Sequence, residues 1–410
     1  MKSAPRPLPR SIALLLVTIA LAAVVTTARA EPFRPTDPNL VLLRVTPTAG
    51  RDADRAGAWS ASPAPSAGAT EFAAALTEAA AHIEEGRRFG QPRGFGRAEA
   101  MLEAVRATGA RSAEWHVLSA DIHQYRHEYI RALALLDNAV RIDATHVRAH
   151  LMRAAIRQTR GELRAARADC AAILGVGEQL LGGACLAQIL GLTGNLDRAY
   201  GLLERQLSAA GDRATPAVRT WILGALADMA ERRGDTARAE LHLRRALEVD
   251  PHDAYARLAL ADLLIEGGNS SAALLVLDGQ PHSSATLLRR AEAHRALGSP
   301  AGDAQATTIA RALRASLEDS RRRGEQVDWR DGARLARLEG RKCDALRAAD
   351  RNWQVQREPI DARLLATTAA ECGERAALEP LLRWRKLARY QDAQLDGLLR
   401  RWHSDVAVGT

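Results

Sequence analysis

The stretch that decides the fold is residues 220–253, TWILGALADMAERRGDTARAELHLRRALEVDPHD. Gly234 divides it into two runs rich in Ala, Leu, Arg and Glu, which favour helices. A glycine between two helices can take a positive φ without the steric cost of a Cβ atom. Ala227 and Ala239 flank this turn and are small enough for two antiparallel helices to cross closely. Residues 220–253 are therefore predicted to form a helical hairpin.

The same arrangement recurs at a period of about 34 residues, which indicates an internal repeat. Gly161, Gly194 and Gly268 mark equivalent turns between helical runs. Small residues stand at matching offsets after these turns and before them: Ala166, Ala199, Ala273, Ala154, Ala187 and Ala261. The alternative, a generic Ala/Leu helical bundle, has no reason to keep its turns at one interval.

This pattern resembles the tetratricopeptide repeat. The positions of 220–253 that match the family's pattern are Leu226, Ala227, Gly234, Ala239, Leu243, Ala246, Asp250 and Pro251. The other stretches that resemble it best are 113–146, 147–180, 180–213 and 254–282, the last with a shortened second helix. The resemblance implies an all-α fold, a right-handed α-solenoid of antiparallel helix pairs forming a tetratricopeptide-like superhelix.

The repeat domain is expected to cover residues 69–390. A divergent pair precedes the best repeats, with helices near 70–85 and 95–107 joined by a Gly- and Pro-rich loop. Approximate pairs follow at 284–318, 326–359 and 359–390, with turns at Gly298, Gly340 and Gly373. Residues 391–410 are predicted to be a capping helix and tail, because a terminal repeat must cover its outer face.

The first thirty residues are typical of a secretory signal peptide. Lys2, Arg6 and Arg10 precede the uncharged apolar run 12–25, and Ala28-Arg29-Ala30 forms a cleavage pattern. The alternative is an uncleaved anchor, but the apolar run is shorter than the ~20 residues of a membrane-spanning helix. We expect cleavage after Ala30 and a periplasmic or secreted protein.

Residues 31–68 are rich in Pro, Ala, Ser and Gly and are predicted to be a linker. Within it, 40–45 is apolar enough for a short strand or for an arm packed on the first repeat.

Charge and motifs argue against two function classes. The formal net charge is +8, but part of it lies in the predicted signal peptide, and no basic run is interleaved with aromatics. Nucleic-acid binding is therefore not expected. The sequence contains no HExxH, G-x-S-x-G or P-loop motif, and no G-x-G-x-x-G between a strand and a helix. We accordingly expect no catalytic residues and no cofactor.

The four cysteines suggest two disulfides. Cys170 and Cys185, and likewise Cys343 and Cys372, fall in a second helix and the next first helix when they are counted in the repeat register. Each pair lies at a similar height across that interface, so we predict Cys170–Cys185 and Cys343–Cys372. The alternative is four buried free thiols packed as small apolar residues. The absence of a CxxC spacing argues against a redox or zinc site.

Five histidines are close in sequence: His116, His123, His127, His146 and His150. The i, i+4 pairs His123/His127 and His146/His150 would present two imidazoles to one metal ion on a continuous helix. However, His127 lies in a predicted turn and His146 near a helix end. Solvated histidines are the simpler interpretation, and we assign no metal ligands.

In tetratricopeptide proteins the first helix of each repeat lines an inner, concave groove. Transferred by register, the groove residues here are Asp121, Gln124, Tyr125, Arg148, Gln158, Gln188, Trp221, Asp228, Glu231, Arg232, Tyr255 and Asp262. Exposed Trp and Tyr often anchor interfaces, although Trp221 and Tyr255 are equally compatible with partial burial in the core. No Lys falls in this groove, so binding of a partner's terminal carboxylate through the family's Lys/Asn arrangement is not indicated.

The leading functional hypothesis is a non-catalytic exported scaffold that binds a protein or peptide partner through the concave face. The alternative is an accessory protein of a metal or cell-envelope system, with a ligand site at the His116–His150 cluster. Neither the partner nor the oligomeric state follows from the sequence.

Overall fold

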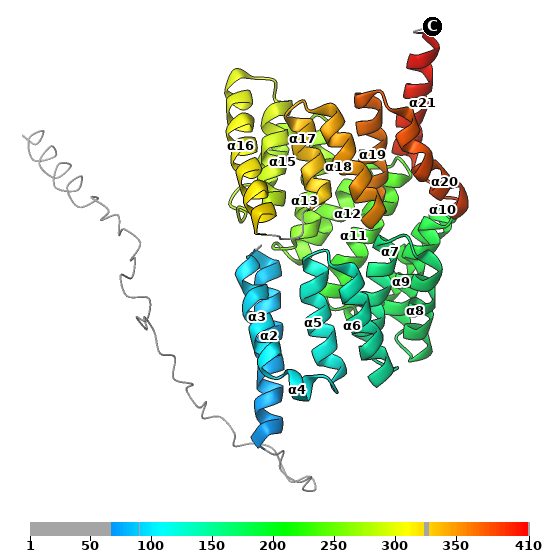
Figure 1. Cartoon of the computed structure of the whole chain (residues 1–410). Coiled ribbons are helices and arrows are strands. Elements are labelled where there is room, and N and C mark those ends of the chain that lie inside the picture. The colour runs from blue at the N-terminus through cyan, green and yellow to red at the C-terminus, as the bar shows by residue number, and fades with distance from the viewer. Residues whose placement is uncertain (1–66, 90, 324–327, 409–410) are drawn as a thin grey trace, which may run out of the picture. The chain divides into compact units, whose positions relative to one another are not determined.

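The computed structural model describes residues 67–89, 91–323 and 328–408. The predicted signal peptide, and the predicted linker up to residue 66, lie outside these residues. Every regular element in the described part of the chain is a helix (Figure 1), so the all-α prediction is confirmed. None of the described helices combines the length and the apolar character needed to cross a membrane.

The helices form consecutive antiparallel pairs, as an α-solenoid requires. The α-helices are α2 (Ala67–Phe89), α3 (Pro92–Ala104), α4 (Arg106–Gly109), α5 (Ala113–Tyr125), α6 (Tyr129–Ile142), α7 (Val147–Thr159), α8 (Leu163–Gly175), α9 (Gln179–Leu192), α10 (Leu196–Ala210), α11 (Pro216–Arg232), α12 (Thr236–Val249), α13 (Ala254–Glu266), α14 (Ser270–Val276), α15 (Ser284–Ala296), α16 (Pro300–Arg322), α17 (Trp329–Leu338), α18 (Lys342–Val355), α19 (Pro359–Cys372), α20 (Glu379–Ala388) and α21 (Ala393–Val408). Two short 3₁₀ helices, η1 (Gly211–Arg213) and η2 (Arg375–Leu378), complete the set.

The turns within the pairs have the predicted geometry. Gly161, Gly194, Gly234 and Gly268 have φ angles of 76°, 83°, 79° and 77°. The first regular pair, α5 and α6, departs from this rule, because His127 occupies the equivalent position with a φ of 59°. A side chain with a Cβ atom is uncommon in this region of φ, ψ space.

Small residues lie where the helices of a pair cross. Ala154, Ala187 and Ala261 are at most 2% exposed, and Ala166 and Ala199 on the facing helices are fully buried. Larger side chains cover the rest of the interface, and the largest apolar cluster joins α9 to α14 with Leu, Ile and Met residues. Close approach at alanines and burial of larger side chains around them therefore generate each hairpin.

The first pair differs from the prediction. No long loop joins its helices, since α3 begins at Pro92 and includes Gly94 and Gly96. A Cβ atom on Gly94 would lie 2.5 Å from the carbonyl oxygen of His82, so these two helices pack more tightly than any larger residue permits. The glycines that suggest a loop in the sequence instead permit a close helix crossing.

The junction between α10 and α11 interrupts the regular spacing. Residues 211–213 form η1, and α11 then starts at Pro216 and is 17 residues long. The neighbouring first helices are shorter, with 14 residues in α9 and 13 in α13. The first helix of this pair is therefore about one turn longer than its neighbours.

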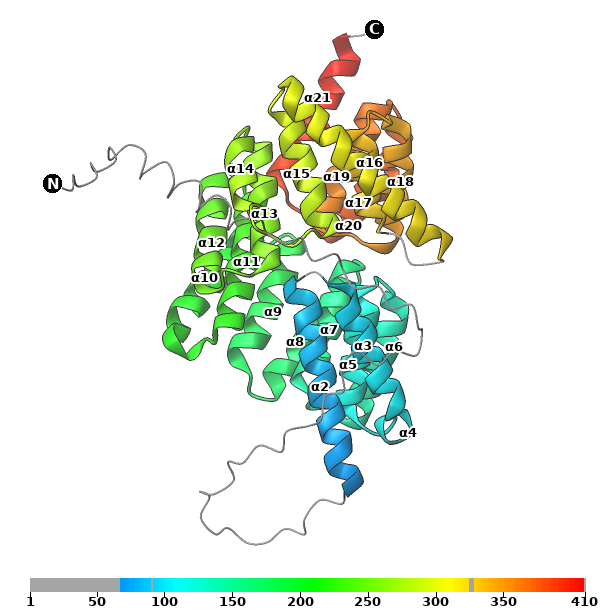
Figure 2. The same ribbon diagram turned by 90° about the vertical axis from the view of Figure 1, so that its left-hand side faces the viewer.

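The later repeats pack against the turn edge of the earlier ones (Figures 1 and 2). The amide of Arg357 donates to the carbonyl oxygen of Thr159 at 2.6 Å. The amide of Leu196 donates to Oε1 of Gln391 at 3.1 Å. Leu192 belongs to the same apolar cluster as the residues of α18 to α21. These contacts join segments of the chain that are almost 200 residues apart. The last helices therefore pack directly on the turns of the earlier repeats.

Candidate functional site

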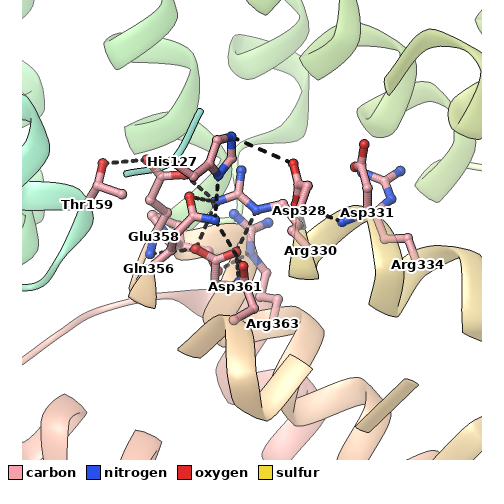
Figure 3. A network of polar contacts seen from close by, with 12 residues as sticks. His127, Thr159, Asp328, Arg330, Asp331, Arg334, Gln356, Glu358, Asp361 and Arg363 are labelled. Atoms are coloured by element: carbon pink, nitrogen blue, oxygen red, sulfur yellow. Dashed lines mark hydrogen bonds and ion pairs between the residues drawn. The ribbon is translucent and has the colours of Figure 1, made fainter. Parts of the chain in front are cut away.

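A row of arginines on α17 organises the inner face of the later repeats. Arg330, Arg334 and Arg337 are four and three residues apart in the sequence and therefore share one face of the helix. The helix begins at the N-cap Asp328, whose side chain accepts a hydrogen bond from the amide of Asp331 at 3.1 Å. Figure 3 shows Arg330 and Arg334 among the polar groups of neighbouring segments.

Arg334 connects three helices. Its Nη2 atom is 2.6 Å from Oδ1 of Asp262 on α13, and its Nε donates to Glu292 on α15 at 3.0 Å. Arg289, also on α15, approaches Asp262 at 2.7 Å. Burial alone would raise the pKa of Asp262, but the two guanidinium groups hold it below its usual value. Asp262 is therefore ionised and bound between two cations at neutral pH.

Arg330 binds the acidic residues at the start of α19. Its Nε atom lies 2.6 Å from Oδ1 of Asp361, and it also pairs with Glu358 at 2.5 Å. Glu358 and Asp361 form a capping box, in which each side chain accepts from the backbone of the other residue. Asn352 donates to Asp361 at 2.7 Å. Burial and the nearby Glu358 charge raise the pKa of Asp361 in spite of Arg330.

One carboxyl group in this network has no cation bound to it in the described structure. Burial and the neighbouring Asp328 carboxylate raise the pKa of Asp331 to about 6, and the more distant charges of Arg289, Arg334 and Arg330 oppose this shift. Ionisation of Asp331 is therefore disfavoured in the folded protein.

The same network reaches the first regular repeat. The Tyr129 hydroxyl donates to Oε1 of Gln356 at 2.9 Å, and the Gln356 amide lies 3.3 Å from Nδ1 of His127. Thr159 donates to Glu358 at 2.9 Å. His127 and Asp328 approach to 3.9 Å (Figure 3). The turn edge of α5 to α7 is thus hydrogen-bonded to the segment between α18 and α19.

Arg363 and Arg232 make a second contact of this kind. Arg363 on α19 forms an ion pair with Glu231 on α11 and lies 3.4 Å from Asp392. Arg232 is only 2% exposed, donates to the carbonyl oxygen of Gly191 at 2.8 Å and stacks on Tyr390, 5.7 Å from the ring centroid. Both arginines stabilise the packing of the later repeats on α11.

Several predicted groove residues are engaged within the chain. Asp121 is fully buried and forms ion pairs with Arg87 and Arg148, the second of which also pairs with Glu114 at 3.0 Å. Glu231, Arg232 and Asp262 are held as described above, and Asp228 pairs with Arg232 at 3.0 Å. Arginines from other helices neutralise Asp121 and Asp262, and Asp228 of the same helix, α11, neutralises Arg232. These three predicted groove residues are therefore ion-paired within the chain.

The aromatic groove residues behave differently from one another. Tyr125 stacks on Phe95 at a centroid distance of 3.6 Å. Trp221 is half-buried and packs against two apolar clusters. Tyr255 is 60% exposed on the first turn of α13, where its ring lies over Gly224 of α11. Gln124, Gln158 and Gln188 are half-buried. Of this set, Tyr255 offers the most accessible aromatic surface.

The histidines do not form one cluster. His116 bonds to the carbonyl oxygen of Ala110, His123 to Glu128, and His146 caps α7 and lies 3.2 Å from Glu114. His150 is buried between Asp169 and the carbonyl oxygen of Ala144, and His127 faces Gln356. The described residues contain no group of three or more potential metal ligands. The structure therefore does not bring the predicted histidine cluster together.

Both predicted cysteine pairs are bonded in the structure. Cys170 on α8 and Cys185 on α9 have Cα atoms 5.4 Å apart, and Cys343 on α18 and Cys372 on α19 have Cα atoms 5.0 Å apart. Each bond joins a second helix to the next first helix. The first pair is buried, whereas Cys343 is exposed.

The arginine row on α17 is absent from the predicted site, and so are its acidic partners other than Asp262. Their spacing on one helix face is visible in the sequence, but their partners come from α13, α15 and α19. In the sequence, the signal for these arginines is the repeat register of the divergent stretches 284–318 and 326–359.

The family described as "Tetratricopeptide repeat" matches residues 230–299, from the end of α11 to the turn after α15. The chain thus contains tetratricopeptide repeats. No curated protein matches its sequence.

Several solved structures are similar over much of the repeat domain. A chain from a study of Pseudomonas aeruginosa PilF is 19% identical with a TM-score of 0.36, and the alignment covers 50% of this chain and 91% of that chain. A tetratricopeptide repeat protein from Parabacteroides merdae is 13% identical with a TM-score of 0.36, covering 73% and 99%. A chain of the Cut9–Hcn1 assembly of the APC/C is 13% identical with a TM-score of 0.47, covering 75% and 59%. These likenesses are too distant to carry an argument about function.

Proposed function

Because the chain contains tetratricopeptide repeats, we propose that it is a non-catalytic, exported scaffold that binds a protein or peptide partner on the inner face of its repeats. Proteins with this repeat commonly bind such partners and are generally not catalytic. We retain the inner face as the binding surface. We leave out Asp121, Arg232 and Asp262 as partner-binding residues, since their charges are paired within the chain.

The observation that carries the proposal is the exposure of Tyr255. Its ring is 60% exposed, yet it lies on Gly224, whose missing side chain leaves room for it. A Cβ atom on Gly224 would lie 2.9 Å from Cε1 of Tyr255. An aromatic ring fixed on a rigid helix pair loses little conformational entropy on binding and is a frequent interface anchor.

Site-specific crosslinking in the native cell tests this face. A photoreactive residue would replace Tyr255 in one variant and Leu275 in a matched control. Leu275 is 78% exposed but lies on α14, a second helix of its pair. We expect one dominant protein to be crosslinked from position 255 and not from position 275, and to be lost from a tagged Tyr255→Ala protein. Equal capture from both positions would contradict binding at the inner face.

Export rests on the sequence of residues 1–30 and has its own test. We expect the protein purified from its native cell to begin at Glu31, as measured by intact mass and N-terminal peptide analysis. A full-length chain that remains in the cytoplasm would refute the export proposal without affecting the binding proposal.

A further inference from the structure

The inner face of α11 and α13 carries acidic side chains beside Tyr255. On α13, Glu266 follows Tyr255 after about three helical turns and therefore lies on the same face of the helix. On α11, the Tyr255 ring lies over Gly224. Asp228 and Glu231 follow Gly224 at a spacing of four and three residues, which places them on its face of α11. An exposed aromatic ring and three carboxyl groups therefore share this inner face.

The arginines that pair with the acids of α11 are less accessible than the acids themselves. The side chains of Arg232 and Arg363 are only 1% and 11% exposed. Their partners Asp228 and Glu231 are 27% and 25% exposed. Each pair occupies one carboxylate oxygen, so that Oδ1 of Asp228 and Oε2 of Glu231 accept no hydrogen bond within the described part of the chain. Arg363 also lies 3.4 Å from Asp392, which divides its charge between two carboxylates. The accessible groups of this face are therefore predominantly acidic.

Glu266 has no cationic partner of its own. It is exposed at the end of α13 and forms no ion pair with any residue that the structure describes. The charged groups around it are Glu231 of α11, Asp262 of its own helix, Arg363 of α19 and Arg334 of α17. The surrounding protein and the charge of Glu231 raise the pKa of Glu266 to about 7, in spite of the two arginines. A further cation beside Glu266 would favour its ionised form.

Carboxylates also act on the Tyr255 ring. The surrounding protein raises the pKa of the Tyr255 hydroxyl, and the charges of Asp228, Glu358 and Glu231 raise it further. The face of an aromatic ring attracts a cation that lies within about 6 Å of the ring centroid. The chain as a whole has a formal net charge of +8, so the acidity of this face is a local property. Both the ring and its surroundings favour a guanidinium or ammonium group over an anion.

We propose that the partner presents a basic segment to this face, with one Arg or Lys side chain over the Tyr255 ring and a second paired with Glu266. This inference rests on the proposed binding at Tyr255 and adds the chemistry of the partner. At 1.5 Å per helical residue, the two positions are about 16 Å apart along α13. An extended chain covers this distance in about five residues. The basic residues of the partner are therefore expected about five positions apart.

Titration of the purified full chain with short peptides tests the charge preference. The probe is an acetylated and amidated hexapeptide with arginine at both ends and alanine and glycine between them. Its counterparts carry glutamine or glutamate at both ends. We expect the arginine peptide to bind at least about 10-fold more tightly than the glutamine peptide, and less tightly as the salt concentration rises. We expect no binding of the glutamate peptide. Equal binding of the arginine and glutamine peptides, or no binding of the arginine peptide at millimolar concentration, would overturn the proposal.

Matched variants connect the binding to the two contacts. Glu266→Gln should weaken binding of the arginine peptide about 5-fold. Glu248→Gln is the control and should leave it unchanged, because Glu248 is exposed on α12, the second helix of its pair. Tyr255→Phe should retain the affinity, whereas Tyr255→Leu should lower it about 3-fold, since leucine fills space but attracts no cation. Unchanged affinity in both Glu266→Gln and Tyr255→Leu would overturn the proposed contacts.

Binding should also release protons. Glu266 is partly protonated at pH 7, and pairing with a cation lowers its pKa, so the affinity for the arginine peptide should rise from pH 6 to pH 8. Calorimetry in buffers of different ionisation enthalpy measures the protons released, and Glu266→Gln should abolish the release. An affinity that does not change with pH would overturn the contact with Glu266.

The partner captured by crosslinking separates this inference from the proposed function. Peptide mapping locates the segment of the partner that is joined to position 255. Two basic residues about five positions apart in that segment would support the inference, whereas a segment without Arg or Lys would overturn it and leave binding at the inner face intact. Failure to capture any partner would count against the proposed function, and the peptide titration would still decide the charge preference of this face.

Discussion

The repeats from α9 to α14 and the repeats from α17 to α21 are held together by different interactions. In the first region, a continuous apolar cluster of Ala, Leu, Ile and Met joins all six helices. In the second, buried ion pairs accompany a smaller cluster that contains Trp353 and Tyr390. Trp384 bridges these two aromatics, with centroids 5.3 Å and 4.9 Å from its own.

The difference follows from what each helix contacts. A helix of α9 to α14 packs mainly on its neighbours in sequence, and small and large apolar residues at regular intervals satisfy that contact. A helix of α17 to α21 also meets the edge of an earlier repeat, where turn carbonyls and charged side chains are present. Polar groups buried at that edge require specific partners. A repeated pattern of small and large apolar residues is therefore sufficient to pack neighbouring repeats. Packing the last helices on the earlier repeats depends instead on particular polar residues at particular positions.

The largest expected effect concerns the ion pairs that connect α13 of the first region to α15 and to α17 of the second. Asp262→Asn removes the carboxylate that binds Arg289 and Arg334, and should lower the free energy of unfolding by about 4 kcal/mol. Chemical denaturation measures this change. Asp303→Asn is the control, since Asp303 and Arg295 form an exposed pair at 3.5 Å that should contribute less than about 1 kcal/mol. Similar losses in the two variants would show that the ion pairs around Asp262 contribute no more to stability than an exposed pair.

The two disulfides also compare the regions, because Cys170–Cys185 joins α8 to the first helix of the first region and Cys343–Cys372 lies within the second. Cross-linking of loops of 15 and 29 residues should stabilise each by about 3 kcal/mol, slightly more for the longer loop. Mild reduction followed by alkylation should label Cys343 and Cys372 first, because Cys170 and Cys185 are buried. Intact mass and peptide mapping give the order. Labelling of Cys170 first would mean that the regular repeats open more readily than the divergent ones.

Two turn glycines allow the contribution of the contact between the regions to be measured, because only one of them lies at that contact. A Cβ atom on Gly194 would lie 2.9 Å from Cβ of Arg389, whereas one on Gly268 would meet nothing within 4 Å. Both residues have positive φ, so alanine costs about 1–2 kcal/mol at either position. Gly194→Ala should cost about 1 kcal/mol more through overpacking. Hydrogen exchange of α20 and α21 should accelerate only in Gly194→Ala; equal exchange in both variants would argue against the contact.

The smallest effect depends on pH. The pKa of Asp331 is raised to about 6, so the folded state resists its ionisation. Its contribution to stability is present below the unfolded pKa near 4 and is lost as the pH rises through about 6. Asp331→Asn should therefore gain stability relative to the native protein between pH 4.5 and pH 7.5, as measured by denaturation at the two values. A gain in the opposite direction would mean that Asp331 is bound by a cation.

The regular part of the fold follows from local patterns. Gly161, Gly194 and Gly234 indicate their turns because positive φ favours glycine, and the alanines at fixed offsets indicate the helix crossings. The repeat register likewise places the cysteines on facing helices. In each case the interacting residues belong to one repeat or to adjacent repeats, so a period of about 34 residues is sufficient to locate them.

The interactions of the inner-face residues are harder to predict from the sequence. Register places Asp121, Glu231 and Asp262 on the groove, but it contains no information on the charges that other helices bring to them. Arg363, for example, meets Glu231 from a repeat that is 132 residues further along the chain. Such contacts are set by the pitch of the superhelix, which depends on every intervening crossing angle.

The hydrogen bond between Tyr129 and Gln356 has a consequence for how such a chain can evolve. An open solenoid gains or loses a repeat at little cost, because each repeat contacts only its neighbours. Here the two partners are 227 positions apart, and their meeting depends on the number of hairpins between them. Duplication or deletion of one hairpin would move Gln356 along the edge and away from Tyr129. The copy number of this array is thereby fixed by geometry, while substitutions within each hairpin remain free to diverge.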